Sequence, residues 1–262
     1  MRPPVRVLDP DVTGRAPRGY LWSYAAPGGD VLLEFDRHRS LAPLQQRLQG
    51  FTGTIQTDAY AVYQALASQQ PGLTRIGCLA HVRRRFYAAL EEDLPDAVWF
   101  IAQIGSLYRI EDEARDQSAA ARQVLRQQRA PAIWAALKAK AAALQPIVLP
   151  KSTMGKAISY FLDEYDALIG YLRDERFEID NNLIENDIRP TAVGRKRWLF
   201  IGHPHAGWRS AVIYSVLVSC RRRGINPEMY LTDVLRRLPS VKITDIDALL
   251  PARWHPPSAD TG

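Results

Sequence analysis

The sequence predicts an α/β fold made of a mixed β-sheet, a helical insertion and a C-terminal helical segment. Short β-rich runs, separated by turns that contain proline or glycine, fill residues 5–35. Alanine- and leucine-rich segments with helical periodicity then replace the strand signals over residues 83–176. Near the C-terminus, a long apolar helical stretch ends at Gly224, and Asn226 begins the next helix. This order of strands and helices is typical of a mixed α/β protein.

Five strands are expected before the insertion. VRVL, YLWSYA and VLLEF are the first three, and the PGG turn between the last two is a hairpin signal that predicts antiparallel neighbours. TIQTD and LTRIGCL follow as the fourth and fifth strands, joined by the short helix AYAVYQALAS. The insertion should hold three or four helices, with breaks at Pro95, near Ser118 and over residues 146–152. After it we expect a short helix over residues 181–189, stopped by Pro190, and then RKRWLFIG as a strand or extended loop.

Composition sets modest bounds on function. The 262 residues include 34 basic and 28 acidic side chains, which give a formal net charge of +6. This excess alone does not indicate a nucleic-acid partner, because many basic proteins have none. Its distribution is more informative, since basic triplets occur at residues 83–85, 195–197 and 221–223, each beside an aromatic or apolar run.

The cysteines and the apolar runs bear on the compartment. Cys78 and Cys220 cannot build a disulfide framework, which favours a reducing environment. No apolar stretch approaches the ~20 residues that span a bilayer, and the start MRPPVRVLDPD lacks the apolar region of a signal peptide. We therefore expect a cytoplasmic protein with no membrane partner.

Asp58 ends the strand-like segment TIQTD. A carboxylate at the carboxyl end of a strand lies where open α/β sheets place their ligands, so Asp58 is a candidate for binding or catalysis. The same position also suits a structural role, as the N-cap of a helix that starts at Ala59. The local pattern leaves both interpretations open.

Glu185 lies in the predicted helix EIDNNLIENDIRP, for which Asp180 is a good N-cap. A helical wheel separates an apolar face from a polar face, with Leu183, Ile184 and Ile188 on the first and Asn182, Glu185 and Arg189 on the second. The structural alternative is a solvated face with a Glu185–Arg189 pair worth ~0.3–0.5 kcal/mol. Two consecutive asparagines are poor helix formers, which indicates that their side chains are used.

The segment GCLAHVRRRF places His81, Arg84 and Arg85 on one face at a spacing of i, i+3 and i+4. Such a cluster can clamp phosphates, because arginine offers bidentate hydrogen bonds. The alternative is a basic surface turn against which His81 packs. Cys78 and His81 also form half of a zinc site, but no second pair of metal ligands with suitable spacing exists, so zinc is not favoured.

A third segment, GRKRWLFIGHPHAGWRSAV, interleaves basic and aromatic side chains. Arg195, Lys196 and Arg197 stand beside Trp198 and Phe200. This mixture suits a nucleic-acid groove, where charges follow the phosphates and exposed rings stack on bases. The alternative is a core strand in which Trp198 and Phe200 are buried.

Together these segments resemble the catalytic region of the insertion-sequence-66 family of bacterial transposases. GYLWSY, TIQTDAYAVY, GCLAHVRRRF, EIDNNLIENDIRP, GRKRWLFIG and the run from IYSVLVSCRRRG to ITDIDALLPARW occur in the family's order and cover nearly the whole chain. The resemblance implies an RNase-H-like fold with an Asp-Asp-Glu triad that holds two Mg²⁺ ions for DNA cleavage and strand transfer. Asp58 then resembles the second aspartate and Glu185 the glutamate, and both are expected metal ligands.

The resemblance also implies partners and domains. Double-stranded DNA is the expected partner, as transposon ends and as target, bound by a homo-oligomer. The expected DNA contacts are His81, Arg84, Arg85, Arg189, Arg195, Lys196 and Arg197. Residues 1–205 should form an RNase-H-like catalytic domain with its helical insertion at about 88–176, residues 206–254 a C-terminal helical segment, and residues 255–262 a disordered tail.

The sequence departs from the family's pattern at its start. The family's first aspartate stands in a short D-E-T-P-V run, and the corresponding letters here are MRPPV, so this aspartate falls on Met1. The family's N-terminal DNA-binding and oligomerisation region is also missing. Asp9 and Asp11 lie too far along the first hairpin to replace that aspartate. We therefore expect a truncated transposase with little strand transfer or, alternatively, a catalytically dead DNA-binding remnant or regulator of transposition.

Overall fold

The computed structural model describes residues 4–256, apart from the side chains of Arg195, Lys196 and Trp198. The chain forms two compact units. The first, here called the sheet unit, contains residues up to Arg39 and from Leu183 onward, and the second, the helical unit, contains Ser40–Asn182. The predicted tail over residues 255–262 lies outside the described part from residue 257 on.

The sheet unit is built on a four-stranded mixed sheet of order β3-β2-β1-β6. Strand β1 pairs antiparallel with β2 and parallel with β6, and β2 pairs antiparallel with β3. The PGG turn therefore forms the predicted hairpin between β2 and β3, with Gly28 in the left-handed region at φ 67°. The strands are β1 Pro4–Val7, β2 Arg18–Ala25, β3 Val31–Asp36 and β6 Phe200–Ile201.

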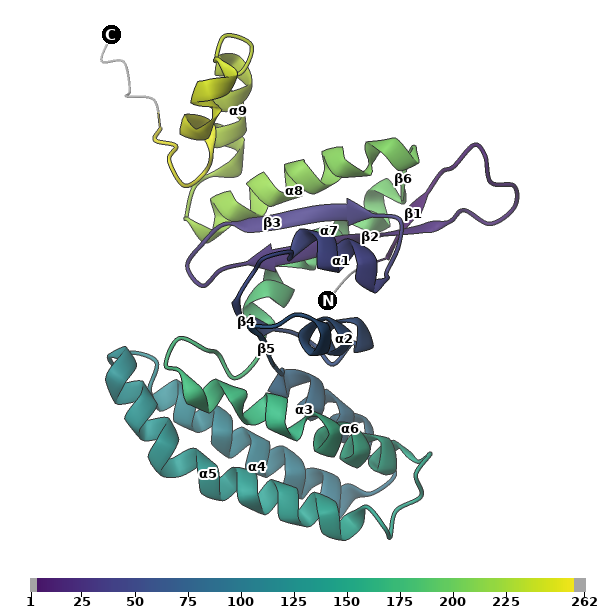
Figure 1. Ribbon diagram of the computed structural model, residues 1–262, viewed down its shortest axis with the longest axis vertical. Helices are drawn as coiled ribbons and strands as arrows, with labels where there is room; N and C mark the ends of the chain where they lie inside the picture. Colours follow the sequence, from purple (N-terminus) through teal and green to yellow (C-terminus); the bar gives the residue numbers. More distant parts are fainter. Residues whose placement is uncertain (1–3, 257–262) are drawn as a thin grey trace. The chain divides into compact units, whose positions relative to one another are not determined.

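Helix α8 (Gly207–Arg222) covers the edge strand β3 (Figure 1). The hydroxyl oxygen of Ser219 accepts a hydrogen bond from the backbone N–H of Val31 at 3.0 Å, and that of Ser215 accepts one from Leu33 at 2.7 Å. These serines satisfy edge-strand groups that would otherwise be open to pairing with another chain. Gly207 lets the helix approach, because a Cβ at this position would lie 2.1 Å from the ring of Phe35.

Helix α7 extends further than the sequence predicted, from Asn182 to Trp198. The expected stop at Pro190 is wrong, because the helix continues through this proline. The Thr191 hydroxyl donates to the carbonyl of Ile188 at 2.6 Å, and Ile188 packs in the core beneath the sheet. Packing thus offsets the cost of the interior proline. The expectation of a strand or extended loop over RKRWLFIG is also corrected: the segment is helical up to Trp198, and only Phe200–Ile201 forms a strand.

The helical unit opens with α1 (Leu41–Arg47) and a parallel pair of strands, β4 (Gly53–Gln56) and β5 (Leu73–Ile76), connected by α2 (Ala61–Gln69). These are the fourth and fifth predicted strands. The expectation of one continuous sheet is wrong for them, because β4 and β5 form a two-stranded sheet of their own, and the edge of β1 is paired with β6.

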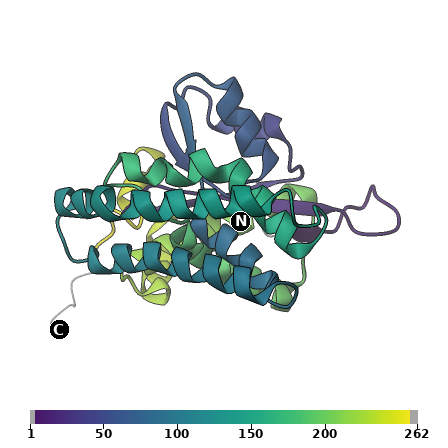
Figure 2. The same ribbon diagram turned by 90° about the horizontal axis from the view of Figure 1, so that it is seen from below.

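Four helices complete the helical unit, as the sequence predicted. Figure 1 shows them packed together, and Figure 2 shows the long blue-green helices lengthwise. Their shared core contains Phe86, Phe100, Trp134 and Phe161, with the rings of Phe86 and Phe100 stacked 4.1 Å apart. The helices are α3 Leu79–Ala88, α4 Leu94–Glu113, α5 Ala119–Leu144 and α6 Thr153–Leu168, followed by a 3-10 turn over Ile169–Arg173.

The C-terminal region follows α8 as the helix α9 (Pro227–Arg237) and a 3-10 turn over Ile243–Leu249. Asn226 caps α9 as predicted, since its side chain accepts from the backbone N–H groups of Glu228 and Met229. Tyr230 and Trp254 pack with Cys220 and join this element to α8. None of the helices that the structure describes has the length and apolar character needed to span a bilayer.

Candidate functional site

Asp58 directly follows β4, whose ladder extends one residue further because the N–H of Thr57 donates to the carbonyl of Ile76 at 3.1 Å. The Asp58 carboxylate is half-buried and accepts a hydrogen bond from the N–H of Tyr60 at 3.3 Å. Helix α2 begins only at Ala61, so Asp58 is not the N-cap of a helix starting at Ala59. Asp58 therefore stands just after the carboxyl end of a parallel strand, the region where open α/β sheets place their ligands.

Residues 178–182, which lead into α7, lie along the carboxyl ends of β4 and β5. The side-chain amide of Gln56 donates to the carbonyls of Gly77 at 3.2 Å and of Glu178 at 2.7 Å. The N–H of Asn181 donates to the sulfur of Cys78 at 3.4 Å. The motifs TIQTD, GCLAHVRRRF and EIDNN therefore meet at one edge of the helical unit, which sequence spacing alone does not show.

Two buried oxygen atoms at this edge have no hydrogen-bond partner among the described residues, the Oγ1 of Thr57 and the Oδ1 of Asn181. Thr57 precedes Asp58, and Asn181 immediately precedes α7. Buried polar atoms are nearly always satisfied, so such atoms are expected where water, an ion or a substrate group binds. Hydroxyl, amide and carboxylate oxygens are hard donors that suit Mg²⁺, so the chemistry of these residues fits that ion.

Asp180 is held from two directions. The Tyr108 hydroxyl donates to its Oδ2 at 2.6 Å, and the N–H of Asn182 donates to its Oδ1 at 2.9 Å. Helix α7 begins at Asn182, so Asn181 and not Asp180 stands at its N-cap position, and the predicted N-cap role of Asp180 is corrected: Asp180 precedes the cap and accepts from the Asn182 amide. Burial of the Tyr108 ring, followed by the negative charge of Asp180, raises the pKa of Tyr108 far above its ordinary value.

Glu185 lies in the first turn of α7 and is half-buried. The predicted apolar face is only partly correct: Ile188 is buried, whereas the Leu183 side chain is 56% exposed. The difference arises because α7 packs on the sheet through its later turns. The Asp187 carboxylate pairs there with Arg222 of α8 at 2.6 Å. Asp58 belongs to the helical unit and Glu185 to the sheet unit.

The predicted cluster of His81, Arg84 and Arg85 lies on α3, which begins at Leu79, and not on a turn. Both arginines are exposed, and His81 is half-buried. The guanidinium of Arg85 lies 3.9 Å from the centre of the Tyr160 ring, which orients it by a cation–π contact. Arg83, which the prediction of DNA contacts omitted, is also exposed and faces the rings of Tyr87 and Tyr108 at 5.5 and 6.0 Å.

The third predicted segment exposes part of its basic and aromatic side chains. Arg189 and Arg197 are exposed, while the side chains of Arg195 and Lys196 lie outside the described residues. Phe200 is 44% exposed and Trp208 is 59% exposed. The alternative that Phe200 is buried in a core strand is therefore wrong.

The third basic triplet has a structural role. Arg222 pairs with Asp187 and also donates to the carbonyl of Gly29 at 3.0 Å. Arg223 pairs with Asp30 at 2.6 Å. These contacts fasten the end of α8 to the β2–β3 hairpin, so we do not count this triplet among the candidate DNA contacts.

Asp9 is already engaged in the sheet unit. Its side chain is 4% exposed and accepts a hydrogen bond from Arg37 at 2.6 Å and another from the N–H of Asp11 at 3.2 Å. The expectation that Asp9 does not replace the family's first aspartate stays a prediction, and Met1, to which the sequence assigned that aspartate, lies outside the described residues.

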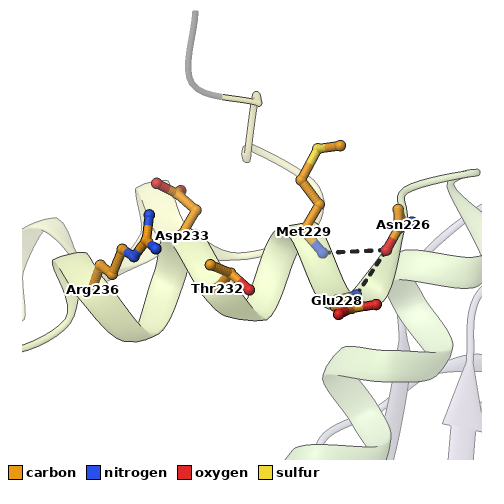
Figure 3. A pocket seen from close by; sticks show the side chains of 6 residues that line it. All are labelled: Asn226, Glu228, Met229, Thr232, Asp233 and Arg236. Carbon is orange, nitrogen blue, oxygen red and sulfur yellow. Dashed lines mark hydrogen bonds between the residues drawn. The ribbon is translucent and has the colours of Figure 1, made fainter. Parts of the chain in front are cut away.

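Within residues 4–256, no group of three or more His, Cys, Asp or Glu side chains is arranged to hold a metal ion. The two cysteines are free, and burial raises the pKa of the Cys78 thiol to about 11. A shallow pocket of about 390 Å³ on α9 contains none of the predicted site residues (Figure 3). Its Asp233 carboxylate accepts instead from the indole of Trp254 at 2.7 Å.

Comparison with known proteins shows that the class of this chain is that of the transposases. Residues 3–209 match the family model described as "Transposase IS66 family", and residues 215–252 match the "IS66 C-terminal element". The chain belongs to the IS66 family of transposases. No solved structure matches it.

Curated relatives come from Sinorhizobium fredii (strain NBRC 101917 / NGR234). The chain is 33% identical to "Uncharacterized protein y4jD" over 89% of its own length and 47% of the relative. It is 32% identical to "Uncharacterized protein y4qI", with 93% of the chain and 48% of the relative covered. The chain therefore spans about half the length of these relatives.

Proposed function

We propose that this chain carries the Asp-Asp-Glu catalytic region of a transposase that cleaves DNA and joins strands by phosphoryl transfer on an RNase-H-like core. Asp58 and Glu185 are the second and third carboxylates of that site. The observation that carries the proposal is the meeting of three family motifs at the carboxyl ends of β4 and β5, where Asp58 stands and α7 begins.

The chemistry of the donors supports this assignment. Asp58 and Glu185 supply carboxylate oxygens. Thr57, beside Asp58, and Asn181, just before α7, add two buried oxygens that have no hydrogen-bond partner among residues 4–256. When bound, two Mg²⁺ ions would stabilise the attacking and leaving oxygens of an in-line displacement. The chain's own residues hold and orient, with carboxylates binding the ions and arginines binding DNA phosphates.

Exposed basic residues supply the expected DNA surface. Arg84 and Arg85 on α3 and Arg189 and Arg197 on α7 present charge to solvent, and Phe200 follows as an exposed ring. Arginine forks position the phosphate backbone and rings stack on bases. We include Arg195 and Lys196 in this surface on their sequence position, and we propose that the transposase acts on double-stranded transposon ends as a homo-oligomer.

The first carboxylate of the proposed triad is not assigned to any of the described residues. Position 1 carries methionine where the resemblance places an aspartate, and Asp9 is bound to Arg37. Loss of a single group that stabilises the transition state costs ~10²–10³ in rate, so we propose that strand transfer needs a first carboxylate in addition to Asp58 and Glu185.

The test is a cleavage and joining assay with Mg²⁺ on matched transposon-end DNA. It compares the chain with a version extended by an Asp-Glu-Thr strand and the N-terminal region of a relative. We expect the extended chain to join DNA ends, and Asp58→Asn and Glu185→Gln in that chain to reduce joining by at least ~10²-fold. The exposed Asp163→Asn is the matched control and should join normally.

Other outcomes separate the alternatives. Joining that survives Asp58→Asn or Glu185→Gln would refute the assignment of that residue. Strong joining by the unextended chain would show that Asp9, Asp11 or another group completes the site. DNA binding without cleavage by the extended chain would favour a regulator of transposition.

A further inference from the structure

The end of the helical unit is fastened by a hydrogen bond from the helical insertion. The Tyr108 hydroxyl on α4 donates to Asp180 at 2.6 Å. Asp180 also accepts from the N–H of Asn182 at 2.9 Å and from its side-chain amide at 2.8 Å. We propose that Tyr108 and Asp180 are positioning residues, which hold the N-terminal end of the helix that carries Glu185 at the carboxyl ends of β4 and β5.

The hydroxyl of Tyr108 has a role that packing does not explain. Phe100, Ile104 and Leu107 form the fully buried face of α4, whereas Tyr108 lies at its margin, half-buried, with the Arg83 guanidinium 6.0 Å from its ring. A hydrogen bond to a carboxylate is about twice as strong as one between neutral groups. Because the pKa of Tyr108 is raised, the hydroxyl stays protonated and remains a donor at neutral and alkaline pH.

The segment held by these hydrogen bonds, Asp180 to Asn182, is also the end of the helical unit. The boundary between the units falls between Asn182 and Leu183, within the first turn of α7. Glu185 lies three residues beyond Asn182, which is ~4.5 Å along a helix axis. The hydrogen bonds of Asp180 thus hold the residues from which the helix that carries Glu185 starts. Gln56 and Cys78 hold the preceding residues Glu178 and Asn181, so the Tyr108–Asp180 bond completes the fastening.

The role of these hydrogen bonds in positioning Glu185 rests on the proposed function. The hydrogen bonds among Tyr108, Asp180 and Asn182, here called the clamp, can be tested without measuring catalysis. Hydrogen exchange of the full chain would be followed in Tyr108→Phe, Asp180→Ala and Asp180→Asn. Tyr87→Phe is the matched control, because Tyr87 is exposed and faces the same arginine.

We expect amides of residues 182–186 to exchange about tenfold faster in Tyr108→Phe and faster still in Asp180→Ala, with helix α5 unchanged. Asp180→Asn keeps one acceptor for the Asn182 amide and should restore part of the protection. Unchanged exchange at these amides in both Tyr108→Phe and Asp180→Ala would overturn the proposal, as would equal acceleration in Tyr87→Phe.

Binding of Mn²⁺, followed by electron paramagnetic resonance on the same proteins, links the clamp to Glu185. Loss of a residue that orients a metal ligand typically weakens metal binding 10–100-fold, so Tyr108→Phe should weaken it by roughly tenfold. Unchanged Mn²⁺ affinity in Tyr108→Phe, in a chain where Glu185→Gln weakens binding, would show that Glu185 is not positioned and overturn the inference. Equal Mn²⁺ affinity of the wild type and Glu185→Gln would count against the proposed function. The hydrogen-exchange rates would still test whether Tyr108 and Asp180 hold the start of α7.

Discussion

Glu164 on α6 shows how single buried charges hold the helical unit together. Its carboxylate accepts two hydrogen bonds from Arg75 of β5, at 2.7 and 3.0 Å, and one from the amide of Gln64 on α2 at 2.7 Å. Both partners of the ion pair are largely buried, with side chains 9% and 3% exposed. This network links α6 and α2 to the small sheet that ends at Asp58.

We expect Glu164→Ala to lower the free energy of unfolding by ~3–5 kcal/mol, because it leaves the Arg75 charge buried and unpaired. Urea unfolding followed by circular dichroism would measure the change. The exposed Glu91→Ala is the matched control and should stay within ~0.5 kcal/mol of the wild type. A loss below ~1 kcal/mol for Glu164→Ala would show that the pair contributes little.

Burial also changes the pKa of the Cys78 thiol, and the change can be measured. Its pKa is raised from 9.0 to about 11, first by burial of the thiol. The folded state therefore keeps the proton longer than the unfolded state. The stability contributed by this group is complete below pH 9 and is lost as the pH rises towards about 11.

The corresponding prediction concerns thiol reactivity. A shift of two pKa units leaves ~100-fold less thiolate at pH 8, so iodoacetamide should alkylate Cys78 at least ~100-fold more slowly in the native protein than in urea. The native rate should rise about tenfold per pH unit between pH 9 and 10. Mass spectrometry of the Cys78 peptide gives both rates, and fast alkylation at pH 8 would contradict the buried setting.

Among the elements, those with local signals were predictable. Strands β1 to β3 alternate apolar and polar residues and are separated by turns, and the insertion shows helical periodicity with Ser118 and Ser152 as caps. The sequence-based prediction ended α7 too early because proline is a local stop signal. In the structure, the packing of Ile188 and the hydrogen bond of the Thr191 hydroxyl stabilise the helix beyond Pro190. The parallel pairing of β6 with β1 depends on residues far apart in sequence, which no local pattern reports.

The end of α7 stores backbone strain that a substitution can relieve. Leu199 follows the helix with φ 63°, a conformation that glycine adopts more easily than leucine, and its side chain is 60% exposed. Leu199→Gly should raise the free energy of unfolding by about 1 kcal/mol. Leu238 ends α9 with ordinary helical angles (φ −51°) and is the control, since Leu238→Gly should destabilise by ~0.5–1 kcal/mol. Thermal unfolding of the two variants would check the opposite signs.

The basic surfaces of α3 and α7 carry the next prediction. Replacing Arg84, Arg85 and Arg197 with alanine should make the slope of log K against log salt less steep by up to ~2.7, because each phosphate contact contributes ~0.9. Fluorescence anisotropy with double-stranded DNA at several salt concentrations measures this slope. Arg115→Ala removes an equally exposed arginine that pairs with Asp112, and it should leave the slope unchanged. An unchanged slope in the triple variant would remove these arginines from the DNA surface.

At the scale of the whole molecule, the division into two units is the main departure from the predicted single sheet. The buried core of the four-helix bundle lies entirely between Leu79 and Ile179, within the helical unit. We therefore expect a fragment of residues 40–182 to fold alone and unfold cooperatively on heating. Circular dichroism would show this, and a fragment without a cooperative transition would mean that the helical unit depends on the rest of the chain.

The candidate site was predictable only in part. Asp58, Glu185 and the basic residues stood out by their motifs, and the helix-start signal at Asp180 placed the beginning of α7 one residue too early. The role of Tyr108 could not be predicted, because Tyr108 lies in a helix with apolar periodicity and is separated from Asp180 by 72 positions in the sequence. The sequence also could not predict that oxygens of Thr57 and Asn181 are buried without a hydrogen-bond partner in the described part of the chain, because burial and partners depend on the fold.

The central claim is that Asp58 and Glu185 share metal ions in one transposase site. Anomalous diffraction at the manganese edge, from crystals of the full chain grown with Mn²⁺, tests it most directly. We predict manganese bound by both carboxylates, since ions ~3.5–4 Å apart require their ligands to converge. Carboxyl groups of Asp58 and Glu185 more than ~10 Å apart, with manganese at neither or at only one, would contradict it.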